Sequence, residues 1–119
     1  AGVFGLAFKH PRRGLAVGGD FGAPDVAENA SAHTRDGVRW RNGGDLEVLA
    51  EDAAWLGGHH DRIVVSTGES GETAGSHLSW DGGRSWTLFS GTGYHTLDCT
   101  KDLSCWAAGG GGRAGRIGF

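Results

Sequence analysis

The segment Ser79-Trp80-Asp81-Gly82-Gly83-Arg84-Ser85-Trp86 decides the fold, because it has the composition of a tight hairpin turn that leads into a strand. An aspartate in a turn accepts hydrogen bonds from backbone N–H groups, and the Ser79 hydroxyl offers a further local hydrogen bond. Gly82 and Gly83 supply the positive φ angles that such a turn requires. Trp86 then begins the next strand with a large ring that can pack within or between sheets.

A second copy of this segment lies upstream at Thr34-Arg35-Asp36-Gly37-Val38-Arg39-Trp40 and is one residue shorter. Asp36 and Asp81 are 45 residues apart, and Trp40 and Trp86 are 46 residues apart. A period of this length is typical of a four-stranded propeller blade. The missing residue predicts that the first turn differs from the second.

Short β-prone runs repeat in phase with the two turn segments. Runs that end in glycine are found at Leu15–Gly19, Ile63–Gly68 and Cys105–Gly109, and shorter strand candidates precede them at Phe4–Phe8, Ala53–Leu56 and Thr96–Cys99. We expect strands A to D in chain order, with each Asp-containing segment as the C–D turn. The chain is therefore predicted to be all-β, a single partial β-propeller domain of about two and a half four-stranded antiparallel blades, drawn at 2–43, 44–91 and an incomplete 92–119.

Composition supports this fold and excludes several functions. Glycine accounts for 24 of the 119 residues, far above its usual share of about 7%, as tight turns require. The net charge is −3, with 11 Lys and Arg against 14 Asp and Glu, so no basic stripe is expected for a nucleic-acid backbone. No apolar run approaches the ~20 residues of a membrane helix. The chain contains no methionine, and we expect it to be part of a longer or processed product.

The two turn segments resemble the Asp-box, or bacterial neuraminidase (BNR), repeat. The wider string GLAVGGD, TRDGVRW, SWDGGRSW, YHTLDC and SCWAAGGGGR is similar to the C-terminal part of bacterial propeller proteins related to photosystem II assembly and stability factors, which are often labelled oxidoreductases. The resemblance covers nearly the whole chain. It implies structural rather than catalytic roles for two sets of residues: Thr34, Asp36, Gly37 and Trp40, and Ser79, Asp81, Gly83 and a largely buried Trp86.

Two classes of function remain open. The resemblance to assembly factors implies a non-catalytic platform for protein binding or complex assembly, completed by further blades of a parent chain or by self-association. The alternative is part of a sialidase-like glycoside hydrolase or a glycan-binding propeller. Such an enzyme would need a tyrosine nucleophile with a glutamate partner, and the chain has one tyrosine, Tyr94. We favour the platform over the enzyme. No cofactor is predicted, because no nucleotide-binding glycine motif lies between a strand and a helix.

Candidate binding residues follow from the blade order. The B–C and D–A connections share one rim of a propeller, and loops on a rigid scaffold are where binding residues concentrate. We expect long B–C connections at 20–29 and 69–74, with an exposed Phe21 suited to a protein or sugar contact. The candidate residues on this rim are Asp20, Phe21, Glu69, Glu72, Tyr94, His95 and Arg113.

Histidine and cysteine side chains could bind a metal, and a cysteine pair could form a covalent link. His59, His60 and Asp61 are adjacent, but no histidines show H-E-x-x-H spacing and no C-x-x-C occurs, so no metal site is predicted. Cys99 and Cys105 flank a predicted A–B hairpin loop, where they form either a disulfide or two reduced thiols. The resemblance to exported propellers favours the disulfide and an extracytoplasmic (periplasmic or secreted) location.

Overall fold

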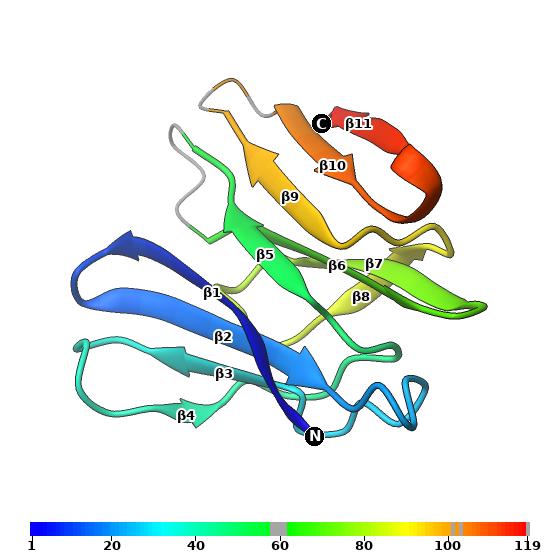
Figure 1. The fold of residues 1–119 in the computed structure, drawn as a ribbon. Coiled ribbons are helices and arrows are strands. Elements are labelled where there is room, and N and C mark those ends of the chain that lie inside the picture. The colour runs from blue at the N-terminus through cyan, green and yellow to red at the C-terminus, as the bar shows by residue number, and fades with distance from the viewer. Residues whose placement is uncertain (58–61, 101, 103, 119) are drawn as a thin grey trace.

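The computed structural model describes residues 1–57, 62–100, 102 and 104–118, and it contains three antiparallel sheets (Figure 1). The first sheet has the order β1 (Gly2–His10), β2 (Arg13–Gly19), β3 (Ser31–Thr34) and β4 (Arg41–Asn42). The second has the order β5 (Asp52–Trp55), β6 (Val64–Ser70), β7 (Thr73–Ser79) and β8 (Thr87–Ser90). The third contains β9 (Thr96–Cys99), β10 (Ser104–Ala108) and β11 (Ala114–Gly118), with a short 3-10 turn, η1 (Gly110–Gly112), before β11.

The arrangement of these sheets is that of propeller blades. Each sheet is formed by strands that are consecutive in sequence, and the first strands β1, β5 and β9 lie next to one another (Figure 1). The predicted fold class is confirmed: the chain is an all-β partial propeller with two four-stranded blades and a third blade of three strands. In the described part of the chain, no helix is long and apolar enough to cross a membrane.

The hydrophobic core lies between the blades. One cluster joins blade one to blade two and includes Leu15, Val17, Ala53 and Val64. A second cluster joins blade two to blade three through Leu56, Val65, Leu78, Leu97, Cys105 and Ala107. Successive residues of β6 point to opposite faces of the sheet, so Val64 packs in the first cluster and Val65 in the second, and blade two is buried on both faces.

Two glycines have the same role in successive blades. A Cβ on Gly18 would lie 1.9 Å from the carbonyl oxygen of Gly2, and a Cβ on Gly68 would lie 2.2 Å from that of Leu49. Such distances exclude any side chain, because another backbone segment occupies the space. Gly18 in β2 and Gly68 in β6 thus leave room for the backbone at Gly2 and at Leu49, which passes close to each strand.

The two C–D turns form equivalent hydrogen bonds although they differ in length. In blade two, Asp81 Oδ1 accepts the N–H groups of Arg84 (3.0 Å) and Ser85 (2.9 Å), and the Ser79 hydroxyl accepts the N–H of Gly83 (2.8 Å). In blade one, Asp36 Oδ1 accepts two backbone N–H groups at 2.8 Å, and the Thr34 hydroxyl accepts the Gly37 N–H (2.9 Å). The first turn is altered as expected, since it has one positive-φ glycine instead of two. Its carboxylate and hydroxyl contacts are nevertheless retained.

The tryptophans of the two turns differ in burial. Trp86 is partly buried, packs against the cluster between blades one and two, and donates its indole N–H to Ser31 Oγ at 3.1 Å. Trp40 is 43% exposed and meets Phe8 edge-on at 5.9 Å. The difference follows from position, because blade one covers Trp86 whereas no described sheet covers the equivalent face of blade one.

The B–C connections are not uniformly long. Residues 20–30 form an irregular connection between β2 and β3, as expected. The expected loop at 69–74 is wrong, because strand pairing continues to Ser70↔Thr73 and leaves a two-residue turn of Gly71 and Glu72. Gly71 has φ 60°, which suits a two-residue hairpin turn.

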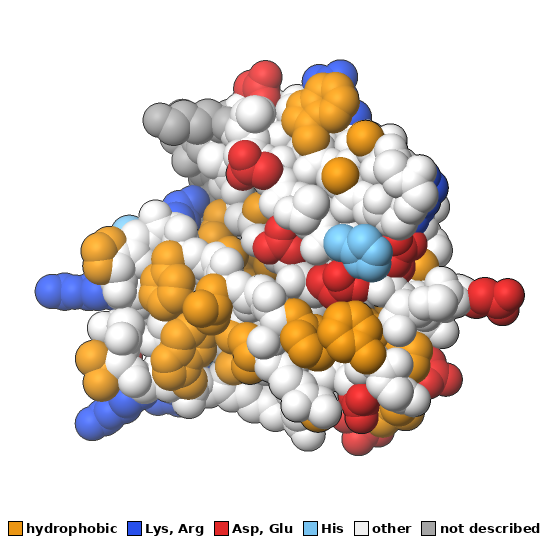
Figure 2. Space-filling view, in the orientation of Figure 1, with side chains coloured by type: hydrophobic (Ala, Val, Ile, Leu, Met, Phe, Trp, Pro, Cys, Tyr) orange, Lys and Arg blue, Asp and Glu red, His pale blue; other side chains and the backbone are white. Residues whose placement is uncertain are grey.

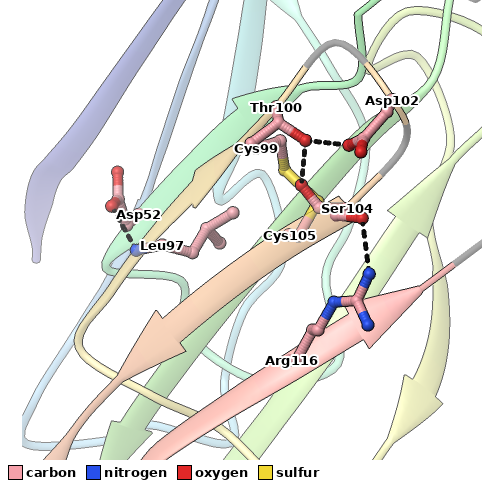
Figure 3. The surroundings of a disulfide bond; sticks show 8 residues. All are labelled: Asp52, Leu97, Cys99, Thr100, Asp102, Ser104, Cys105 and Arg116. Atoms are coloured by element: carbon pink, nitrogen blue, oxygen red, sulfur yellow. Dashed lines mark hydrogen bonds between the residues drawn. A yellow bond between two sulfur atoms is a disulfide. The ribbon is translucent and has the colours of Figure 1, made fainter.

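A disulfide joins the first two strands of blade three. Cys99 and Cys105 are opposite each other in β9 and β10, their Cα atoms are 4.0 Å apart, and their sulfurs are bonded (Figure 3). Ser104 next to it accepts a hydrogen bond from Arg116 of β11 at 3.0 Å. The Asp52 carboxylate of blade two accepts the N–H of Leu97 at 2.7 Å, which ties blade three to blade two beside the disulfide (Figure 3).

Candidate functional site

An open hollow of about 460 Å³ lies on the rim where the β2–β3, β6–β7 and β10–β11 connections emerge. Its lining residues are Phe21, Glu69, Ser70, Gly71, His95, Gly110 and Arg113. Figure 2 shows a histidine flanked by acidic side chains, beside hydrophobic side chains, on the face over the start of β9. The structure thus brings together four of the seven candidate residues, Phe21, Glu69, His95 and Arg113, from four separate parts of the sequence.

Glu69 lies near the end of β6, and donors from blade three surround its carboxylate. Oε1 accepts the N–H of Gly110 at 2.7 Å and lies 3.1 Å from His95 Nε2, while Oε2 accepts Arg113 Nη2 at 2.5 Å. The Gly110 hydrogen bond holds the pKa of Glu69 below its usual value, with further lowering by Arg113 and His95, and these outweigh the opposing effect of burial. Glu69 is therefore ionised at neutral pH.

His95 lies between two carboxylates. Its Nδ1 is 2.7 Å from Glu51 Oε2, and its Nε2 faces Glu69. Both contacts are hydrogen bonds only when each ring nitrogen carries a proton. Glu51, whose other oxygen accepts the Glu69 N–H at 3.2 Å, is a site residue that the sequence prediction missed. No motif marks it, since a single glutamate before a strand has the pattern of a solvated surface residue.

Arg113 is held in place by blades two and three. Its Nε donates to the Gly110 carbonyl (3.1 Å) and its Nη2 donates to the Gly93 carbonyl (3.2 Å) as well as to Glu69. The guanidinium lies 5.1 Å from the ring centroid of Tyr94, within the range of a cation–π contact. These contacts fix the cation at the edge of the hollow.

Tyr94 contacts Arg113 but does not line the hollow. Its ring is half-buried against the cluster between blades two and three. The tyrosine oxygen packs against the backbone of Gly115, where an added Cβ would lie only 2.2 Å from it. A nucleophilic tyrosine would need an accessible oxygen beside a glutamate. The Glu69 carboxylate is instead bound by Arg113, so the arrangement does not favour sialidase-like chemistry.

Phe21 forms the apolar wall of the hollow. Its side chain is 51% exposed, and its ring centroid is 4.6 Å from that of Phe4 at an interplanar angle of 36°. Its carbonyl accepts the Ser70 hydroxyl at 3.4 Å, which connects the β2–β3 connection to the β6–β7 hairpin. An exposed aromatic ring thus lies next to charged groups that are already positioned by other contacts.

The remaining candidates lie outside the hollow. Asp20 Oδ1 accepts the Gly22 N–H at 2.8 Å, and its Oδ2 is 3.9 Å from the amino terminus. Glu72 is exposed at the tip of its two-residue turn. Among the described residues, no group of three or more His, Cys, Asp or Glu is placed to hold a metal ion. His59, His60 and Asp61 lie outside the described residues.

The sheet topology and the blade packing define the class of this protein as a β-propeller. Seven chains of solved structures match it, among them one described as "YCF48 bound to D1 peptide". The match has a TM-score of 0.69 at 19% sequence identity and covers 98% of this chain and 37% of that one. This chain therefore spans little more than a third of the length of its structural neighbour. No protein-family model and no curated protein sequence matches the chain.

Proposed function

We propose that the chain is a non-catalytic propeller module that binds a peptide segment of a protein partner in the hollow lined by Phe21, Glu69, His95 and Arg113. The observation that carries this proposal is the pairing of an exposed aromatic wall with a braced, charged cluster on one rim. Interfaces use aromatic and arginine side chains in this way, with the ring supplying buried area and the cation supplying orientation.

The chemistry of the hollow suits a peptide. Arg113 donates hydrogen bonds from Nε and Nη2 to other groups of the protein. Its Nη1 forms no hydrogen bond with the described residues, so it can donate to a carbonyl or carboxylate of a ligand. Because the guanidinium is fixed by Glu69 and Tyr94, a ligand contact costs little side-chain entropy. A structural neighbour, YCF48, is recorded with a bound D1 peptide, which supports peptide binding by a propeller of this kind.

The same proposal covers the repeat type, the assembly role and the compartment. We infer that the C–D turns at Thr34–Trp40 and Ser79–Trp86 are Asp-box repeats, and their shared carboxylate and hydroxyl contacts support this. A role in complex assembly is supported by the resemblance to photosystem II assembly and stability factors. The Cys99–Cys105 disulfide supports an extracytoplasmic location, since disulfides persist in oxidising compartments.

The test is a selection of peptides from a displayed random library on the chain, followed by anisotropy measurements with a selected, labelled peptide. Phe21→Ala is expected to weaken binding about tenfold or more, as truncation of an interface aromatic does. Val38→Ala is the matched control, because Val38 is 80% exposed on the opposite rim. Equal loss for both variants, or hydrolysis of a fluorogenic sialoside by the chain, would overturn the proposal.

A further inference from the structure

The arginines of this acidic chain are concentrated at one end of the blades. Seven of the nine lie in or beside the A–B and C–D connections of blades one and two, namely Arg12, Arg13, Arg35, Arg39, Arg41, Arg62 and Arg84. In Figure 2, Lys and Arg side chains gather at the left edge, over the β1–β2 and β3–β4 turns, whereas many Asp and Glu side chains lie toward the opposite edge. The overall net charge of −3 conceals this separation.

Four of these arginines surround one hollow. The hollow has a volume of about 330 Å³ and is lined by His10, Arg13, Arg35, Arg62, Asp81 and Arg84. Its walls come from the A–B and C–D connections of both complete blades. It lies on the rim opposite the peptide site proposed above and shares no residue with it.

The arginines of this hollow have no carboxylate partner in the described part of the chain, where the ion pairs involve other groups. The one carboxylate among the lining residues, that of Asp81, already accepts hydrogen bonds within its own turn. Its Oδ1 accepts the backbone N–H groups of Arg84 and Ser85, and its Oδ2 accepts the Ser85 hydroxyl at 2.5 Å. The side chains that face the hollow are therefore predominantly cationic donors.

Two of the lining arginines, Arg13 and Arg84, also act on the buried His33. Burial lowers the pKa of His33, and the charges of Arg84, Arg41 and Arg13 lower it further, against an opposing effect of Asp81. Clustered guanidinium groups that outnumber the carboxylates beside them repel one another, and an anion that bridges them relieves this repulsion. The planar guanidinium fork matches the oxygens of a phosphoryl group, which several arginines can contact at once.

We propose that the hollow between Arg13, Arg35, Arg62 and Arg84 is a second binding site, specific for a phosphate-class oxyanion. The phosphoryl group can belong to a free phosphate or to the headgroup of a lipid. Both sources present the same tetrahedral, multiply charged oxygens to the arginines. The site is independent of the proposed peptide site.

The test measures binding of inorganic pyrophosphate to the full chain by calorimetry, and in a second arm co-sedimentation with phosphatidylcholine vesicles that contain phosphatidic acid. Two charge-matched pairs of variants separate a defined site from diffuse attraction. Arg35→Gln and Arg13→Gln remove lining cations, while Arg39→Gln and Arg12→Gln remove neighbouring cations outside the hollow. Each variant changes the net charge by the same amount.

The proposal predicts that Arg35→Gln and Arg13→Gln weaken binding about tenfold each, the effect of losing one charge-assisted hydrogen bond, whereas the matched controls change it less than about threefold. This pattern with pyrophosphate identifies a free phosphate as the ligand, and the same pattern with vesicles alone identifies a lipid headgroup. Equal losses in lining and control variants, no binding in either arm, or binding only to an acidic peptide would overturn the assignment.

Discussion

Arg113 Nη2 donates a hydrogen bond to Glu69 Oε2 at 2.5 Å, and the two residues are 44 positions apart in the sequence. This contact joins the end of β6 in blade two to the connection that precedes β11 in blade three. Together with the bond from the Gly110 N–H to Glu69, it fixes the charged side of the hollow that we propose binds a peptide. The contact therefore links the packing of two blades to the geometry of one site.

Glu69→Gln should destabilise the fold at neutral pH and have less effect in acid. Because the folded-state pKa of Glu69 lies below its usual value, its ionised form stabilises the fold above that usual value, and the contribution is lost as the pH falls through the lowered pKa. The melting temperatures of wild type and variant should converge as the pH is lowered through the folded-state pKa of Glu69. Glu72→Gln, in the same hairpin but exposed at its tip, should show no such convergence. A constant difference between wild type and Glu69→Gln at all pH values would contradict the lowered pKa.

Ser79→Ala should cost about 1–3 kcal/mol in the free energy of unfolding. Ser79 is fully buried, and its hydroxyl accepts the N–H of the buried Gly83, which would be left without a partner. Urea denaturation provides the measurement, with Ser90→Ala, on a partly exposed strand end, as the control. Equal stability of Ser79→Ala and wild type would show that the hydroxyl does not hold this turn.

Trp86→Ala and Trp40→Ala should separate clearly, although both residues occupy the same place in the repeated segment. Trp86 packs between blades one and two and bonds to Ser31, so its removal should cost about 2–3 kcal/mol, below the value for a fully buried ring. Trp40 is exposed, and its removal should cost less than about 1 kcal/mol. Chemical denaturation of the two variants measures both values, and a larger loss for Trp40→Ala would be inconsistent with the blade packing.

Reduction of the Cys99–Cys105 disulfide should lower the free energy of unfolding by about 2–3 kcal/mol, because the bridge closes only a short loop. Unfolding of the wild type with and without reductant provides the comparison. The double variant Cys99→Ala with Cys105→Ala should not respond to reductant. Two free thiols in denatured, unreduced protein would contradict the disulfide.

Much of the fold is predictable from the sequence because the blade repeats. The paired runs at Leu15–Gly19 and Ile63–Gly68 and the two Asp-containing turns give the strand order, and the structure has these strands in that order. The length of the β6–β7 connection was predicted wrongly. The polar residues from Glu69 to Ala74 have loop composition, yet backbone pairing across Ser70 and Thr73 extends the hairpin.

The candidate site is only partly predictable. Glu69, His95 and Arg113 follow from the blade order, since the connections that carry them emerge on one rim. Glu51 and the Gly110 N–H do not, because their roles depend on how two blades pack and on the backbone path through η1. The different burial of Trp40 and Trp86 has the same origin, because identical motif positions have different neighbours.

The most direct test of the peptide site is amide chemical-shift mapping of the isotope-labelled chain with a library-selected peptide. The proposed function predicts that the amide signals of Phe21, Gly71 and Gly110 shift on titration, because these residues line the hollow. Gly37 and Gly83, in the turns on the opposite rim, should keep their positions. Shifts at Gly37 and Gly83 with unchanged signals for Phe21, Gly71 and Gly110 would contradict the account.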